Sequence, residues 1–145
     1  MPPKEIRKEY SNDSITVVWE PKYCIHSTKC LRALPGVFDF NARPWISVDA
    51  AAADDIANAV SQCPSGALHF ERHDGGPAEE PQPEMTVTER PNGPLYVRGK
   101  IRVLSAEGDV LREDTRMVLC RCGQSANKPF CDGTHTRVGF RTDDN

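Results

Sequence analysis

The chain has 145 residues, 27% of them charged, and a net charge of −3, so it is polar but not charged enough to be disordered throughout. This balance lacks the basic character of a nucleic-acid-binding protein. Its apolar runs fall far short of the roughly 18–20 residues of a membrane span, and no apolar stretch follows the first positive charges. We therefore expect a soluble, cytoplasmic protein with neither a nucleic-acid nor a membrane partner.

The six cysteines form two groups of three, one in each half of the chain. The groups are Cys24, Cys30 and Cys63, and Cys120, Cys122 and Cys131. An odd number of thiols does not suit disulfides within one half, and the expected compartment is reducing. The sequence therefore favours ligation of a metal or a metal cluster.

In the first half, residues 14–20 are rich in β-branched residues, which predicts a strand. Residues 49–62 predict a helix with Asp49 as its N-cap and more acidic residues in its first turns. Apolar residues at helical spacing place Cys63 at the end of the inward face. Residues 67–70 predict a return strand, so the order is strand, helix, strand.

A cysteine pattern accompanies these elements. Cys24 and Cys30 flank the sequence Ile-His-Ser-Thr-Lys, and Cys63 is followed by proline. This pattern resembles the C-x2-C-x2-C…C-P frame of small single-cluster bacterial ferredoxins, with Ser27 in place of the second cysteine. Together with residues 43–46, it more closely resembles a divergent ferredoxin-like family that binds one [4Fe–4S] cluster. The resemblance implies a ferredoxin-like βαβ-type domain.

Three thiolates fit a [3Fe–4S] cluster, or a [4Fe–4S] cluster whose fourth iron binds Ser27, His26 or solvent. His26 is alternatively a hydrogen-bond donor to a cluster sulfur. A domain without a cluster, whose small cysteines only pack in the core, is the remaining alternative. We expect ligation by Cys24, Cys30 and Cys63 and assume no fourth ligand.

Residues 72–84 are rich in glycine, proline and glutamate and have no apolar periodicity, which predicts a linker. Up to residue 84 the chain has 8 Lys and Arg against 13 Asp and Glu, a net charge of −5. The remainder has 10 against 8, a net charge of +2. The two halves therefore differ in electrostatic character.

The second half is predicted to be mostly β. Residues 95–104 alternate, with apolar side chains on one side and Arg98, Lys100 and Arg102 on the other, as in a half-buried strand. Further short strands are predicted at residues 85–89, 110–111 and 117–119.

Four potential metal ligands follow these strands in the order C-x-C-x8-C-x3-H, namely Cys120, Cys122, Cys131 and His135. Asp132 and Gly133 predict a tight turn into a short helix. Soft and borderline ligands this close together indicate a metal site. Ligand chemistry alone leaves a Cys3His zinc knuckle and an iron–sulfur cluster equally open.

Residues 120–135 match the signature of the CDGSH iron–sulfur family, C-x-C-x2-S/T-x3-P-x-C-D-G-S/A/T-H, at each fixed position. The resemblance covers about residues 85–140 and implies a [2Fe–2S] cluster held by the four ligands. The C-x-C segment suits two thiolates on one iron, which leaves Cys131 and His135 for the other. A neutral imidazole in place of a thiolate should raise the reduction potential, and the histidine should make the cluster sensitive to protons.

We therefore expect an α+β protein with a ferredoxin-like domain at residues 1–71, a linker at 72–84 and a CDGSH domain at 85–145. The leading hypothesis is one-electron transfer with a reductase or client as redox partner, with a homodimer left open. A regulatory module that senses redox state or pH, or donates its cluster, is the second hypothesis, and a zinc-stabilised adaptor is the third. We expect no enzymatic activity, because no nucleophile or phosphate-binding motif is evident.

Overall fold

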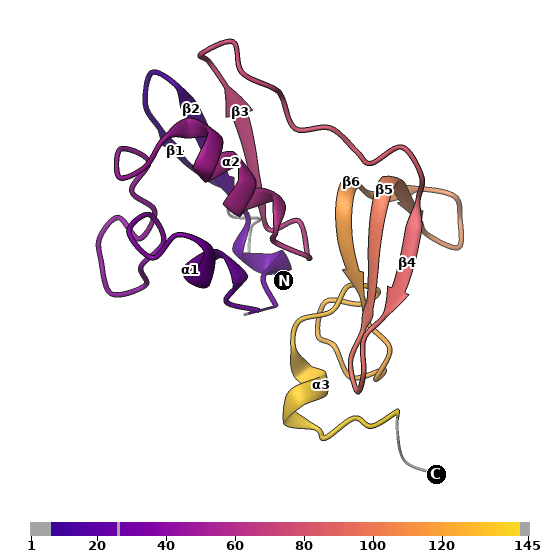
Figure 1. Cartoon of the computed structure of the whole chain (residues 1–145). Coiled ribbons are helices and arrows are strands. Elements are labelled where there is room, and N and C mark those ends of the chain that lie inside the picture. The colour runs from indigo at the N-terminus through magenta and orange to yellow at the C-terminus, as the bar shows by residue number, and fades with distance from the viewer. Residues whose placement is uncertain (1–6, 26, 143–145) are drawn as a thin grey trace. The chain divides into compact units, whose positions relative to one another are not determined.

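The computed structural model describes residues 7–25 and 27–142 (Figure 1). It contains two compact units, each with its own sheet. The first unit comprises the chain up to Cys63 together with Ala67–Glu79, and the second comprises Pro64–Gly66 and the chain from Glu80 onward. In the described part of the chain, no helix has the length and apolar character needed to cross a membrane.

The sheet of the first unit has three antiparallel strands in the order β1-β2-β3. These are β1 (Lys8–Ser11), β2 (Ile15–Trp19) and β3 (Leu68–Arg72). The predicted strand and return strand are therefore both present, and they are direct neighbours, with Val17 opposite Phe70. The central strand β2 is buried from Ile15 to Val18, as its β-branched sequence predicts.

Short helices connect β2 to β3, namely η1 (Pro21–Tyr23), α1 (Lys29–Ala33) and α2 (Ala53–Ser61). α2 contacts both β3 and α1 (Figure 1). It buries the face formed by Ile56, Ala57, Ala59 and Val60. The helical spacing of these apolar residues predicted this face correctly.

The prediction that Asp49 caps this helix is wrong. α2 begins at Ala53, after an N-cap residue, Ala52, that makes no side-chain capping hydrogen bond. Asp49 instead accepts a hydrogen bond of 2.9 Å from the side-chain amide of Asn12. A contact with the turn between β1 and β2 therefore replaces the local cap.

The sheet of the second unit also has three antiparallel strands, in the order β4-β5-β6. These are β4 (Thr86–Glu89), β5 (Leu95–Leu104) and β6 (Val110–Leu119). The predicted alternation of β5 is confirmed, since Val97 and Ile101 are buried and Lys100 and Arg102 are exposed. β6 is one continuous strand where the sequence predicted two short ones.

The pairing of β5 with β6 shifts register between Arg98 and Ile101. Gly99 lies within this irregularity and has a φ of 136°. A Cβ at this position would approach the Cα of Met85 to 2.8 Å, so glycine is required by both conformation and space. Two small antiparallel sheets with few short helices make the protein α+β, as predicted.

Candidate metal centres

In the second unit, the predicted ligands lie in a loop that follows β6 directly. The loop runs back along the end of the strand, where Cys120 N–H donates to the carbonyl of Pro129 at 2.8 Å. Cys131 N–H donates to the carbonyl of Val118, also at 2.8 Å. These main-chain hydrogen bonds place Cys120 and Cys131 on adjacent segments.

The four ligands occur as two close pairs. The sulfur atoms of Cys120 and Cys122 lie 3.9 Å apart. The sulfur of Cys131 lies 3.5 Å from Nδ1 of His135, on the short helix α3 (Thr134–Arg137). Two sulfurs about 2.3 Å from one tetrahedral metal lie about 3.8 Å apart. Each pair therefore has the spacing of two ligands on one metal atom.

The two pairs are near each other, since, in addition to burial, the charges of Cys120 and Cys122 raise the pKa of Cys131. Within residues 7–25 and 27–142, no three His, Cys, Asp or Glu side chains converge on the position of a single metal ion. A two-by-two arrangement is the one that a cluster with two metal atoms needs. The residues present therefore fit a [2Fe–2S] cluster.

Backbone N–H groups surround the first pair of sulfurs. Burial disfavours the thiolate of Cys120, but hydrogen bonds from the N–H groups of residues 123–125 and from Cys122 outweigh burial and lower the pKa of this thiol. Gln124 N–H also lies 3.4 Å from the sulfur of Cys122. Gly123 has a φ of 80°, a left-handed conformation that allows this tight turn.

In the second pair, Cys131 and His135, the surroundings favour the thiolate form of the cysteine less than they do at Cys120. Burial raises the pKa of Cys131, and the nearby Cys120 and Asp132 act in the same direction. The N–H of Gly133, 3.3 Å from the sulfur, offsets part of this effect. A metal cation would remove the cost of ionising closely spaced thiols, which supports a metal at this site.

Asp132 holds the loop in shape. One carboxylate oxygen accepts the N–H of Thr134 at 3.0 Å, and the other accepts the N–H of Ala126 at 2.9 Å. Burial opposes ionisation of Asp132, but hydrogen bonds from Thr134 and Ala126 outweigh it and lower the pKa to about 2. The predicted turn at Asp132 and Gly133 is therefore present and also ties the two ends of the loop together.

In the first unit, the three cysteines come from the ends of short helices. Cys24 follows η1, Cys30 lies in α1 and Cys63 follows α2. Burial, together with the charges of the nearby Cys63 and Cys24 thiols, raises the pKa of Cys30 to about 11. The fold thus brings near one another thiols that are separated by up to 39 positions in the sequence. Three neighbouring cysteines fit a cluster with three cysteine ligands.

Ser27 and His26 were considered as fourth ligands. Ser27 lies at the start of α1, where its hydroxyl oxygen is 3.4 Å from the N–H of Lys29. His26 lies outside the described residues. A ligand role for either residue stays a prediction.

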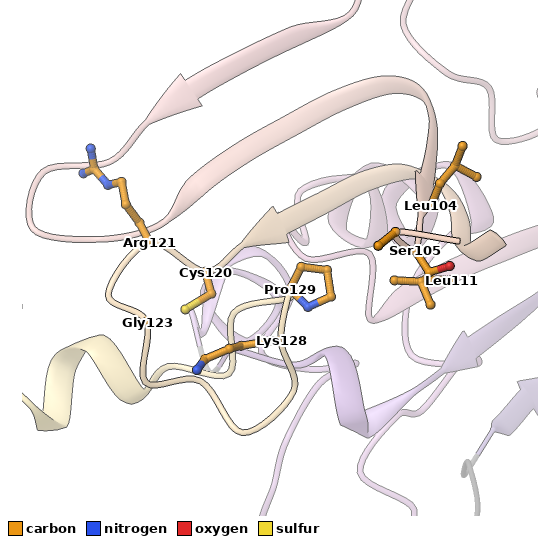
Figure 2. A pocket seen from close by; sticks show the side chains of 9 residues that line it. Leu104, Ser105, Leu111, Cys120, Arg121, Gly123, Lys128 and Pro129 are labelled. Carbon is orange, nitrogen blue, oxygen red and sulfur yellow. The ribbon is translucent and has the colours of Figure 1, made fainter. Parts of the chain in front are cut away.

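An open groove of about 570 Å³ borders Cys120 (Figure 2). Its lining combines apolar side chains of the β5–β6 hairpin, Leu104 and Leu111, with Pro129 and Lys128. In Figure 2 the sulfur of Cys120 and the side chain of Lys128 extend to the same side. The groove gives one ligand sulfur an open approach, which no local sequence signal indicated.

Sequence reasoning also missed Arg121, which lies between two ligands but points away from Cys120 (Figure 2). Its guanidinium donates to the carbonyls of Gly93 at 2.8 Å and Arg90 at 2.7 Å. A basic residue between paired cysteines was visible in the sequence. Its partners lie about thirty positions earlier, so its contacts were not.

Comparisons with known proteins agree with these two centres. Residues 10–73 match a family described as "Divergent 4Fe-4S mono-cluster", and residues 92–136 match "Iron-binding zinc finger CDGSH type". Each family therefore matches a different half of the chain. The mono-cluster match contains all three cysteines of the first unit, and the CDGSH match contains all four predicted ligands of the second.

A curated relative, the uncharacterized protein YjdI of Escherichia coli K12, is 33% identical over 64 residues. The match covers 44% of this chain and 83% of that protein. YjdI of Escherichia coli O157:H7 matches to the same extent. The predicted resemblance to both families is therefore confirmed, and the chain is an iron–sulfur protein with a mono-cluster domain and a CDGSH domain.

Proposed function

We propose that the protein transfers single electrons between a redox partner and its two iron–sulfur centres. The observation that carries this proposal is the pairing of Cys120 with Cys122 and of Cys131 with His135 about one site. When bound there, a [2Fe–2S] cluster supplies a one-electron redox couple. The groove beside Cys120 supports the proposal, because it gives a partner protein access to one ligand sulfur.

The ligand residues set the expected order of reduction potentials. His135 is a neutral ligand where a fourth thiolate would be anionic, so the CDGSH centre is the higher-potential site. In the mono-cluster domain, Cys24, Cys30 and Cys63 hold a [3Fe–4S] or [4Fe–4S] cluster in a ferredoxin-like fold, with no fourth protein ligand assumed. We assign this domain the exchange with a reductase or client, and no catalytic reaction of its own.

A regulatory role is the second candidate. His135 is only half-buried and lies on a helix of four residues, so this side chain is accessible to solvent. This favours a module that senses redox state or pH, or donates its cluster. The third candidate, a zinc-stabilised adaptor, is weakened by the two-by-two ligand arrangement, since structural zinc takes four ligands around one atom.

The test is anaerobic purification of the full chain, with iron, acid-labile sulfide and zinc counts and paramagnetic resonance. We expect about five or six irons per chain, a reduced [2Fe–2S] signal and a second cluster of lower potential. One zinc per site with no sulfide would identify the adaptor instead. Only two irons would remove the mono-cluster assignment.

A further inference from the structure

We propose that Arg121 is a positioning residue that acts on His135 through the turn between β4 and β5. This turn, residues 90–94, is called the β4–β5 turn below. The inference rests on the proposed ligation of a cluster by His135. Its consequence is that Arg121, which does not face the site, sets how firmly the histidine end of the cluster is retained.

The first step is the contact between Arg121 and the turn. Nε donates to the carbonyl of Gly93 at 2.8 Å, and one terminal nitrogen donates to the carbonyl of Arg90 at 2.7 Å. The other terminal nitrogen lies 3.2 Å from the carboxylate of Glu89 at the end of β4. The Arg121 side chain is only 23% exposed, whereas that of Glu89 is 78% exposed, so the charge-assisted hydrogen bond to Gly93 is the most shielded of the three.

The second step is the contact between the turn and His135. Nδ1 of His135 faces the sulfur of Cys131, which leaves Nε2 on the other side of the ring. A Cβ placed on the buried Gly93 would lie 3.6 Å from this Nε2, so the turn borders the ring with room for about one methyl group between them. The ring therefore lies between its ligand position and a turn that Arg121 fixes.

A second set of contacts joins the turn to the segment that follows α3. Asn92 N–H donates to the hydroxyl of Thr142 at 2.9 Å, and Thr142 N–H donates to the side-chain carbonyl of Asn92 at 2.8 Å. Phe140 N–H donates to the carbonyl of His135 at 3.0 Å, and the guanidinium of Arg121 lies 5.6 Å from the centre of the Phe140 ring. Arg121 therefore links the segment bearing Cys120 and Cys122 to the segment bearing His135.

The test measures iron release to a chelator from the full-length loaded protein, followed by absorbance. Arg121→Met removes the hydrogen bonds, and Arg121→Lys keeps the charge but not the forked geometry that binds two carbonyls. We expect Arg121→Met to release iron on the order of tenfold faster than the wild type, and Arg121→Lys to release it at an intermediate rate. Arg102→Met is the matched control, because it removes an exposed charge on β5 that pairs with Glu113, and it should leave the rate unchanged.

A double variant distinguishes an effect of Arg121 on the position of His135 from an effect on the stability of the whole unit. If Arg121 acts through His135, Arg121→Met should have no added effect when His135→Cys is already present, since a cysteine side chain is too short to reach Gly93. Equal acceleration in both backgrounds would overturn the inference and make Arg121 a structural residue only.

Two further measurements do not depend on the rate. Gly93→Val should change the hyperfine coupling of the histidine nitrogen in reduced protein, and it keeps the main-chain carbonyl that accepts from Arg121. An unchanged coupling in both Gly93→Val and Arg121→Met would also contradict the proposal. Failure of the wild type to bind iron would instead refute the proposed function, so the two failures are distinguishable.

Discussion

At the residue scale, the stability of the ligand loop depends on polar side chains that are not themselves predicted ligands. Asp132 links Thr134 to Ala126 across the ligand loop through both carboxylate oxygens. The pKa of Asp132 is lowered to about 2, so its stabilising effect is fully present above the unfolded value of about 3.9 and is lost as pH falls toward 2. Measurements near pH 7 therefore report its whole effect.

Asp132→Asn keeps one acceptor oxygen but replaces the other with a donor. We expect the free energy of unfolding of the CDGSH unit to fall by about 1–3 kcal/mol, because the N–H of Ala126 or Thr134 loses its acceptor. The measurement is the urea midpoint of the cluster absorbance at pH 7. Glu107→Gln, on the exposed β5–β6 loop, is the control and should leave the midpoint where it is.

His135→Cys tests the ligand itself. An added thiolate makes the centre one charge more negative, so the reduction potential of the [2Fe–2S] cluster should fall by on the order of 100 mV. Thr136→Cys introduces the same side chain one position later, at an exposed site on α3, and should not change the potential. A redox titration of both variants decides the matter, and equal potentials would argue against ligation by His135.

At the element scale, strands were predictable where alternation or β-branching is strong, as in β2 and β5. The start of α2 was not, because Asn12 competes for Asp49 from 37 positions earlier. Asn12 also accepts the N–H groups of Ser14 and Ile15, each at 2.9 Å, and donates to the carbonyl of Val48 at 3.0 Å. One side chain therefore joins the β1–β2 turn to the segment before α2.

Asn12→Ala should weaken the first unit by about 1–3 kcal/mol, because it leaves several backbone groups without their partner. The expected readout is earlier loss of the mono-cluster spectrum in a urea titration, with the CDGSH spectrum unaffected. Asp13→Ala changes the neighbouring exposed residue and should have little effect. Coincident loss of both spectra would show that the two units do not unfold separately.

At the scale of the whole molecule, the ligand sets were predictable and their supports were not. The cysteines and His135 are identified by residue chemistry and short spacing, which the sequence displays directly. The groove at Cys120 and the contact of Arg121 with the β4–β5 turn depend on how a loop meets segments distant in the chain. No periodicity or motif in the sequence indicates such contacts between distant segments.

Because each unit has its own sheet, we predict that each will keep its own cluster when expressed alone. Residues 1–79 should retain the mono-cluster spectrum, and residues 80–145, which hold all of the second unit except Pro64–Gly66, should retain the [2Fe–2S] spectrum and its potential. Absorbance and paramagnetic resonance of the two fragments are compared with those of the full chain. Absence of both signals after separation would mean that the units depend on one another.

The antiparallel bridge between Leu119 and Phe130, which continues the β6 ladder into the ligand loop, has a consequence for recognition. Main-chain hydrogen bonds fix the backbone on both sides of this bridge, so we expect the sheet to keep the same outline with and without iron. A partner protein that contacts only the strands would then bind the empty and loaded forms equally. We expect a partner that discriminates between the two forms to contact the loop between Gly123 and Lys128, which departs from the ladder and is mostly exposed apart from Ser125.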